Sequence, residues 1–216
     1  MSDKTRKIAV LTGDLVNSTG LGPEKVERAF VALEDCAEMQ AEWMGGQSLH
    51  FTRHRGDGWQ VALAEPKYAL RSALCFRAAL RALGEEFDSY IGIAEGDVEG
   101  EVGPDLNEET NKVFSLSGNA LEEIKSNKDL AYRIAYFERG AKDAASILAD
   151  YISQHWSPIQ AATIAPMLLP TGRPTQTEIA KVLGKTRQAV SKALGAAGTE
   201  AITISFETLE EGYQNA

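Results

Sequence analysis

The amino-acid sequence predicts an α+β domain followed by a small all-α module. Its 216 residues exceed a typical single domain of about 100–150 residues, so two modules are expected. The first 140 residues alternate short β-rich apolar runs with longer segments of helical periodicity. The chain after Ser157 contains mainly helical patterns, with two helix-start signatures close together.

The composition is that of a soluble globular protein. Hydrophobic residues make up 44% and charged residues 25%, which excludes a disordered, collagen-like or fibrous chain. No apolar run approaches the roughly 20 residues of a spanning helix, and the first residues lack the apolar segment of a secretion signal. We therefore expect a cytoplasmic protein with no membrane partner, in which Cys36 and Cys75 are buried thiols.

The predicted α+β domain begins with a strand, a helix and a hairpin. Residues 7–16 form an apolar run that is typical of a strand buried on both faces, and Asp14 lies at its exit. After Pro23 the apolar residues keep helical spacing. Alternating residues on both sides of the segment 55–58 then predict a β-hairpin with Asp57 at its tip.

The following elements complete a sheet. We expect a helix at 66–83, a strand at 89–94, a helix near 118–125 and a strand near 132–136. The resulting order β-α-β-β-α-β is ferredoxin-like, an arrangement that palm-like domains also use. It makes the first strand and the hairpin neighbours, so that Asp14 and Asp57 converge and suit Mg²⁺ or Mn²⁺. An Asp-Gly pair is also a common tight turn, so a structural role for Asp57 stays open.

The all-α module carries two capping boxes, which begin at Ser157 and Thr175. Gly184 supplies a left-handed stop after the helix that Thr175 starts, and Thr186 can cap the next one. Two short helices across a tight glycine turn predict a helix-turn-helix. The alternating residues after Thr199 leave a strand and a helix equally open.

The second of these helices presents basic and polar side chains outward. Residues 171–198 hold five Lys or Arg against one Glu, a net charge of +4, whereas the rest of the −9 chain carries −13. Clustered cations neutralise DNA phosphates, and Arg or Gln near the start of a recognition helix reaches base edges. The predicted DNA contacts are Gln176, Thr186, Arg187, Gln188, Ser191 and Lys192. The alternative is a helical hairpin that serves packing or protein contact.

These patterns divide the chain into three parts. We expect the α+β domain at 1–140, a connecting helix at 141–156 and the helix-turn-helix domain at 157–216. The connecting segment has no Gly/Pro-rich stretch, so the two domains are expected to be mechanically coupled. Helix-turn-helix proteins usually read two half-sites, which predicts a homodimer on double-stranded DNA.

Several segments resemble known families. The pattern Thr-Gln-x-Glu-Ile-Ala-x-x-Leu-Gly followed by Val-Ser-x-x-Leu is similar to the DNA-reading helix pair of bacterial regulators and sigma factors. GDLVNST and RGDGWQVAL resemble the two metal-binding segments of class III adenylate and guanylate cyclases, and IGIAEGDVEG resembles the strand that follows them. The whole chain, over about residues 7–198, resembles the SatD family of bacterial proteins.

The likeness to cyclases has implications for the site. It implies a nucleotidyl cyclase-type sheet with Mg²⁺ or Mn²⁺ at Asp14 and Asp57. The nucleotide contacts that it implies are Arg53, Ser115 and Asn119. Active cyclases also use an Asn and an Arg in the following helix to stabilise the transferring phosphate. This chain has Glu122 and Ser126 near those positions, and neither can replace a cationic clamp.

The sequence therefore predicts a DNA-binding transcriptional regulator whose cyclase-like domain senses a nucleotide ligand and has lost catalysis. The alternative is an enzyme, a divergent metal-dependent nucleotidyl cyclase or phosphotransferase with a DNA-targeting appendage. A third hypothesis is a structural or protein-interaction module with a degenerate site.

Overall fold

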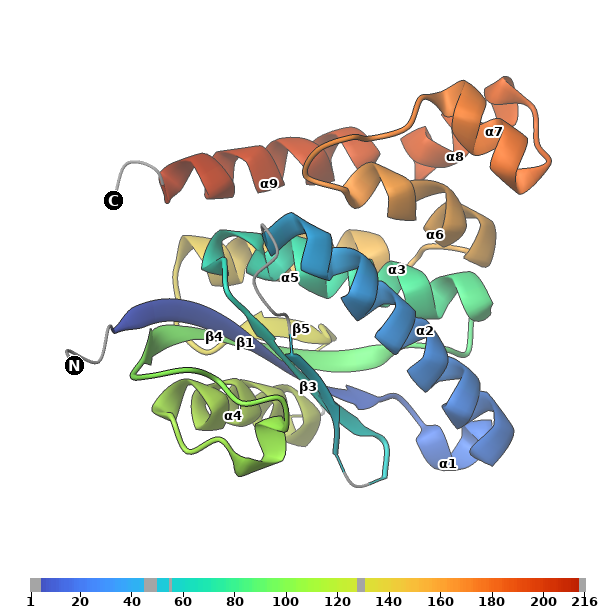
Figure 1. Ribbon diagram of the computed structural model, residues 1–216. Coiled ribbons are helices and arrows are strands. Elements are labelled where there is room, and N and C mark those ends of the chain that lie inside the picture. The colour runs from blue at the N-terminus through green and yellow to red at the C-terminus, as the bar shows by residue number, and fades with distance from the viewer. Residues whose placement is uncertain (1–4, 45–49, 55, 128–130, 214–216) are drawn as a thin grey trace.

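The computed structural model describes residues 5–44, 50–54, 56–127 and 131–213 (Figure 1). The strands of these residues are β1 (Arg6–Leu15), β2 (His50–Arg53), β3 (Gly58–Leu63), β4 (Ser89–Val98) and β5 (Ile134–Tyr136). They form one sheet in the order β2-β3-β1-β4-β5. β1 pairs antiparallel with both β3 and β4, whereas β5 is parallel to β4. The sheet is therefore mixed, with β1 at its centre.

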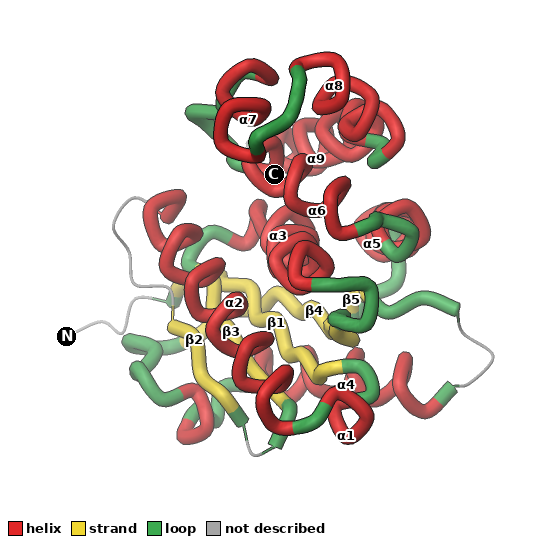
Figure 2. The backbone as a smooth tube through the Cα atoms, turned by 90° about the vertical axis from the view of Figure 1, so that its right-hand side faces the viewer, coloured by secondary structure: helices red, strands yellow, loops and turns green. Residues whose placement is uncertain are grey.

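Helices lie on both faces of this sheet. The α-helices of the described residues are α1 (Ser18–Leu21), α2 (Pro23–Ala41), α3 (Ala69–Leu83), α4 (Lys112–Ser126), α5 (Ala141–Ser153), α6 (Pro158–Ile164), α7 (Gln176–Leu183), α8 (Arg187–Ala196) and α9 (Thr199–Gly212). Short 3₁₀ turns are η1 (Glu42–Met44), η2 (Pro66–Tyr68), η3 (Leu106–Glu108) and η4 (Ala165–Leu168). α2, α3 and α5 cover one face and α4 covers the other. α6 packs on α3 and α9 packs on α5, so the C-terminal helices form a further layer (Figure 2).

The predicted α+β fold is confirmed. The chain passes through β1, α2, β2, β3, α3 and β4, which is the expected β-α-β-β-α-β order. β1 is buried on both faces because successive side chains point to opposite sides of the sheet. Ala9 and Leu11 join the core beneath α2 and α3, whereas Ile8 and Val10 join the core beneath α4.

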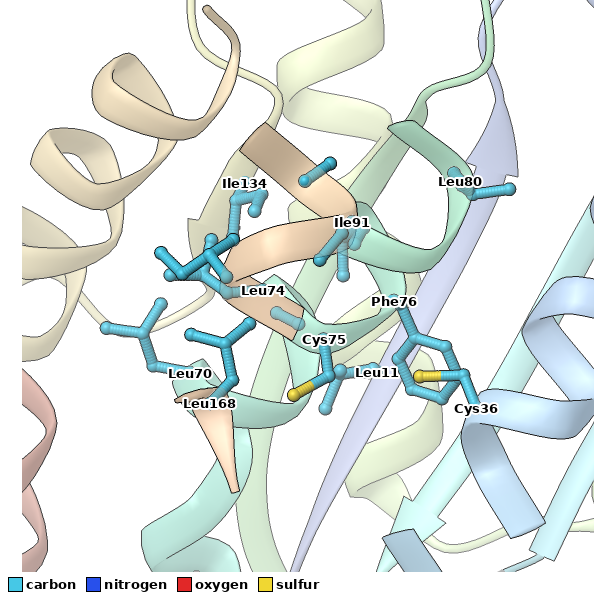
Figure 3. Close-up of a cluster of buried hydrophobic side chains, with 14 of the residues drawn as sticks. Leu11, Cys36, Leu70, Leu74, Cys75, Phe76, Leu80, Ile91, Ile134 and Leu168 are labelled. Carbon is cyan, nitrogen blue, oxygen red and sulfur yellow. The ribbon is translucent and has the colours of Figure 1, made fainter. Parts of the chain in front are cut away.

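One hydrophobic core connects the sheet to the C-terminal helices. Leu11, Leu74 and Leu168 meet in it (Figure 3), and the same cluster continues to Val190 and Phe206. The predicted boundaries at 140 and 156 therefore both lie along a continuous core. The division into separate domains stays a prediction.

Two C-terminal segments acquire a definite structure. Within the segment 141–156, predicted as a connecting helix, Ala141–Ser153 form α5, which packs against β5 and α3 within the helical layer. The end of the chain, which the sequence left open, forms helix α9. Ile202 and Phe206 are buried one turn apart, whereas Ile204 is 55% exposed, so the alternating residues belong to a helix.

Cys36 and Cys75 are buried free thiols, as predicted. Burial raises the pKa of Cys36 to about 12, although Gln40 Nε2 donates a hydrogen bond to its sulfur at 3.2 Å and opposes this rise. Within the part of the chain that is described, no helix combines the length and the apolar character needed to cross a membrane.

Candidate functional site

The first candidate site lies where β1 ends beside the β2–β3 turn. Asp14 is paired with Gly58 in the β1–β3 register, which brings it next to Asp57 at the tip of the hairpin. Leu15 N donates a hydrogen bond to the Asp57 carbonyl oxygen at 3.1 Å and ties the turn to the strand. The ladder thus aligns the two acids that the sequence singled out, as the ferredoxin-like order predicts.

Neighbouring groups hold both acids in place. The Ser18 hydroxyl, at the start of α1, donates a hydrogen bond to Asp57 Oδ2. The Ser89 hydroxyl accepts hydrogen bonds from Asp14 N and from the buried Trp59 Nε1, both at 3.1 Å. The strand end that carries Asp14 is therefore anchored from inside the protein.

Lys125 is the third member of this site. Its Nζ lies 2.8 Å from Asp14 Oδ2, and it reaches the sheet from the last turn of α4. No sequence pattern marks Lys125 as a site residue, because a lysine near a helix end has an ordinary role in stabilising that end. Its position beside Asp14 depends on how α4 packs on β4 and β1.

Burial and charge act in opposite directions here. Burial raises the pKa of Asp14, the hydrogen bond and charge of Lys125 lower it, and the nearby Asp57 carboxylate raises it again, with a net rise. Burial lowers the pKa of Lys125, but the hydrogen bond and charge of Asp14 outweigh this, so its pKa lies above the ordinary value. Lys125 therefore carries a proton and balances the Asp14 charge.

The donor set fits one divalent cation that is shared with a ligand. Mg²⁺ and Mn²⁺ take one or two carboxylates from a protein when phosphate oxygens complete their shell, and Asp14 and Asp57 supply two. The described residues contain no group of three or more His, Cys, Asp or Glu side chains with metal-binding geometry. A cation at this point has to displace the Lys125 ammonium from Asp14.

An open groove of about 360 Å³ leads from Asp57 along α2 to Arg53. Arg53 forms two hydrogen bonds with Glu27, at 2.6 and 3.0 Å, and its guanidinium lies 3.8 Å from the Phe30 ring centroid. Two further predicted nucleotide contacts lie elsewhere: Ser115 and Asn119 are exposed on α4, on the other face of the sheet. The structure thus brings Arg53 near Asp57 and does not bring these two residues to the same groove.

The second candidate site is the pair of helices α7 and α8. Thr175 begins α7 with a complete capping box, in which its hydroxyl accepts from Glu178 N. Gly184 ends α7 with φ of 61°, a left-handed conformation that glycine adopts without a steric penalty. Thr186 then begins α8, where its hydroxyl accepts from Ala189 N at 3.1 Å. The helix boundaries agree with those that the capping signals predict.

Packing orients α8 with its polar face outward. Val190 and Leu194 are buried beside Ile179 and Ala180 of α7. The exposed residues of the predicted DNA-contacting set are Thr186, Arg187, Gln188, Ser191 and Lys192, and Gln176 is partly exposed. This surface does not pack against the rest of the described protein, and the helix pair lies at one end of the C-terminal layer (Figure 1).

Four cations gather on the helix pair. Lys181, Lys185, Arg187 and Lys192 are exposed and form no ion pair with any described residue. Arg173 differs from them because it lies 3.3 Å from Glu207 and donates to the Leu169 carbonyl oxygen at 2.7 Å. The basic character of the segment 171–198 is therefore concentrated on α7 and α8.

Comparisons with known proteins give structural likenesses alone. No protein-family model matches the chain, and no curated protein matches it. A crystal structure of the guanylyl cyclase Cya2 is similar at 22% identity and a TM-score of 0.41, covering 57% of this chain and 72% of that one. A bacterial light-regulated adenylyl cyclase is similar at 18% identity and a TM-score of 0.43, covering 62% and 76%. Likenesses at this level carry no weight for activity.

Proposed function

We propose that this chain is a DNA-binding regulator whose helix α8 enters the major groove of double-stranded DNA. The observation that carries the proposal is the group of four exposed, unpaired cations on α7 and α8. Packing gives no reason to gather such cations in a chain with a net charge of −9, whereas a polyanionic partner does.

The two helices act as a helix-turn-helix in this proposal. Arg187 and Gln188, at the start of α8, reach base edges. Ser191 and Lys192, one turn later, contact phosphates, as do Thr186 and Gln176 at the helix starts. The likeness of this segment to the DNA-reading helix pair of bacterial regulators supports the same assignment. We further propose that the chain is a cytoplasmic homodimer similar to the SatD proteins.

DNA binding is tested by fluorescence anisotropy with duplexes that are first selected from random sequence. The double variant Arg187→Ala/Lys192→Ala should bind more weakly, and the slope of log affinity against log salt should fall by about 0.9, because Lys192 supplies one phosphate contact. The matched control is Arg6→Ala/Lys7→Ala, which removes two exposed cations from β1 and should leave that slope unchanged. Equal losses in the two variants would contradict the assignment of α8.

A second function is proposed for the first site, which is binding of a nucleotide with Mg²⁺ or Mn²⁺. The convergence of Asp14 and Asp57 beside a groove that contains Arg53 supports it. The bound cation would neutralise phosphate charge. Asp14 and Asp57 would hold that cation, and the Lys125 ammonium, once released from Asp14, would face the phosphates.

The position of Lys125 also bears on the alternative that the chain is an enzyme. The helix that carries Glu122 and Ser126 still supplies one cation beside the acids, although an ammonium lacks the fork geometry of Arg. A ligand sensor predicts calorimetric binding of ATP or GTP with Mn²⁺ and no turnover. A cyclase predicts a cyclic nucleotide with release of pyrophosphate, and a phosphotransferase predicts a phosphorylated acceptor with release of ADP or GDP.

Variants separate these outcomes. Asp57→Ala should abolish nucleotide binding or turnover and leave DNA affinity intact. Glu200 is an exposed acid on α9, and Glu200→Ala should change neither the nucleotide activity nor the DNA affinity. Nucleotide binding that survives Asp57→Ala would place the ligand elsewhere. Turnover that survives Lys125→Ala would remove Lys125 from the chemistry.

A further inference from the structure

Helix α5 buries more polar than apolar side chains, which is unusual for a surface helix. Beside Ala149, the side chains that it buries are polar: Asp143, Ser146, Asp150 and Ser153, each at most 5% exposed. The side chains that it exposes are uncharged: Ala141, Ala144, Leu148 and Tyr151. Leu148 is 66% exposed and Tyr151 is 68% exposed. An ordinary surface helix buries its apolar stripe and exposes its charges.

The inward polar face is satisfied, so the helix is not misplaced. Asp150 accepts hydrogen bonds from Arg77 Nη1 and from Arg133 N, the latter at 2.9 Å. Asp143 accepts from Tyr136 N at 3.2 Å. These bonds fix the rotation of α5 about its axis and thereby commit Leu148 and Tyr151 to the outside.

The exposed apolar face continues onto α9. A groove of about 300 Å³ between the two helices is lined by α5 and α9 residues without a single charged side chain. Ile204 adds a further exposed apolar side chain on the solvent-facing side of α9. At 100° per residue the acids Glu200 and Glu211 lie within about 40° of Ile204, on the side away from α5, so they border the apolar face at its outer edge. We name as the α5–α9 surface the residues Ala144, Leu148, Tyr151, Ala201, Ile204 and Ser205.

We infer that the α5–α9 surface binds a second copy of this chain in a two-fold contact. Such a contact sets the same patch against itself, so any charge in the patch meets charges of the same pattern. Two chains that each carry −9 repel one another, and an uncharged apolar surface is where they approach without opposing like charges. This contact between two copies does not require DNA.

The size of the surface sets the strength of the contact. Helices of 13 and 14 residues are each about 20 Å long at 1.5 Å per residue, and neighbouring axes lie about 10 Å apart. Their joint face is therefore on the order of 400 Å² per copy, about half of a standard interface. We expect a weak dimer that dissociates on dilution. Because α9 follows α8 directly, this dimer also fixes the separation of the two helix pairs.

Sedimentation velocity over a range of chain concentrations tests the inference. The wild-type chain should show a reversible monomer–dimer equilibrium, and Leu148→Glu should weaken it about 100-fold or more, because the contact then opposes two buried like charges. The matched control is Val31→Glu, which places the same charge on another exposed apolar residue, on α2, and should leave the equilibrium unchanged. Circular dichroism checks that each variant is folded.

A rescue experiment sharpens the test. Leu148→Lys alone should also be monomeric, whereas an equal mixture of Leu148→Lys and Leu148→Glu should form heterodimers because opposite charges then face each other. A wild-type chain that stays monomeric at several hundred micromolar would overturn the inference and point to another partner. A dimer that Leu148→Glu leaves intact would overturn it too.

The outcome is separable from that of the DNA proposal. Arg187→Ala/Lys192→Ala should dimerise like the wild-type chain, since these residues lie outside the α5–α9 surface. Loss of DNA binding with normal dimerisation affects the helix pair alone, and the reverse result affects this surface alone.

Discussion

The helical layer over the sheet and the α7–α8 pair use cationic side chains in opposite ways. Arg77, on α3, is fully buried. Its Nη1 donates a hydrogen bond to Asp150 Oδ1, and its Nε lies 3.2 Å from Asp88 Oδ1. Arg187 and Lys192, on α8, are exposed and form no ion pair with any residue that the structure describes. Both regions are helical and belong to one core, so the difference lies in solvation.

That difference separates stability from binding. A charge removed from water costs several kcal/mol unless partners and hydrogen bonds replace its hydration, so Arg77 depends on the acids around it. A charge that stays in water costs the fold little and remains available to a ligand. We therefore expect substitutions in the first region to unfold the protein and substitutions in the second to change its contacts.

The largest effect is expected for Asp150→Ala. It leaves the buried Arg77 guanidinium without its main counter-charge, and the free energy of unfolding should fall by about 3–5 kcal/mol. Urea denaturation monitored by circular dichroism measures this loss. Asp143→Ala is the matched control: its partner Arg139 has a side chain that is 53% exposed and regains water, so the loss should be about 1–2 kcal/mol. Equal losses would show that burial of the cation is not the cause.

The next effect concerns the helix pair. Arg187→Ala/Lys192→Ala should lower DNA affinity about 10- to 100-fold at moderate salt. The free energy of unfolding should change by less than about 0.5 kcal/mol, because both side chains are exposed and unpaired. Anisotropy and urea denaturation measure the two quantities on the same preparation. A large loss of stability would contradict the expectation that exposed cations on α8 contribute to binding and not to folding.

A smaller effect is expected at the start of α7. Thr175→Ala removes a complete capping box and should cost about 1 kcal/mol, seen as faster hydrogen exchange of the first amides of α7. Thr208→Ala, in the exposed middle of α9, removes a hydroxyl that caps nothing and should leave exchange nearly unchanged. Caps and apolar contacts, not ion pairs, would then account for the stability of the helix pair.

The smallest effect concerns proton binding at Asp14. Its pKa is raised by burial, with a contribution from Asp57, so the folded state holds the proton more tightly than the unfolded chain. This contribution to stability is present at low pH and is lost as the pH rises through the folded pKa. Asp57→Asn should lower the pKa of Asp14 and reduce that loss, whereas Lys125→Met should raise the pKa further.

NMR titration of the Asp14 carboxyl carbon measures both shifts. Glu122→Gln is the control, because Glu122 acts on the pKa of Lys125 and is not among the groups that shift Asp14. If the pKa of Asp14 stays the same in Asp57→Asn, the two acids do not share a site.

Local patterns were sufficient for most elements of the fold. The capping boxes at Ser157 and Thr175 both formed, because a cap involves residues only three positions apart. The hairpin with Asp57 near its tip also formed, and the strand order then placed this acid beside Asp14. That part of the candidate site was predictable because the ferredoxin-like order makes β1 and β3 neighbours and their buried apolar residues set the register.

Contacts between distant elements were not predictable in this way. Lys125 reaches Asp14 across 111 positions of sequence, and no periodic signal marks such an ion pair. Ser115 and Asn119 lie on a helix that covers the opposite face of the sheet from Arg53, although the resemblance to cyclases implied a shared site. Side-chain identity alone does not say which face of a sheet a helix covers.

Patterns in the sequence predicted the caps that begin α6, α7 and α8, the convergence of Asp14 and Asp57, and the segment in which the basic charge gathers. They did not predict that α4 begins as early as Lys112 or that the residues after Thr199 form a helix. The predicted properties depend on neighbours within a few residues or on one strand ladder. The packing of the layers, by contrast, sets which side chains of α5 face inward: four polar ones and Ala149, while Leu148 and Tyr151 face solvent. That choice depends on Arg77 and Arg133, which lie far away in sequence and reach Asp150 only after the layers have packed.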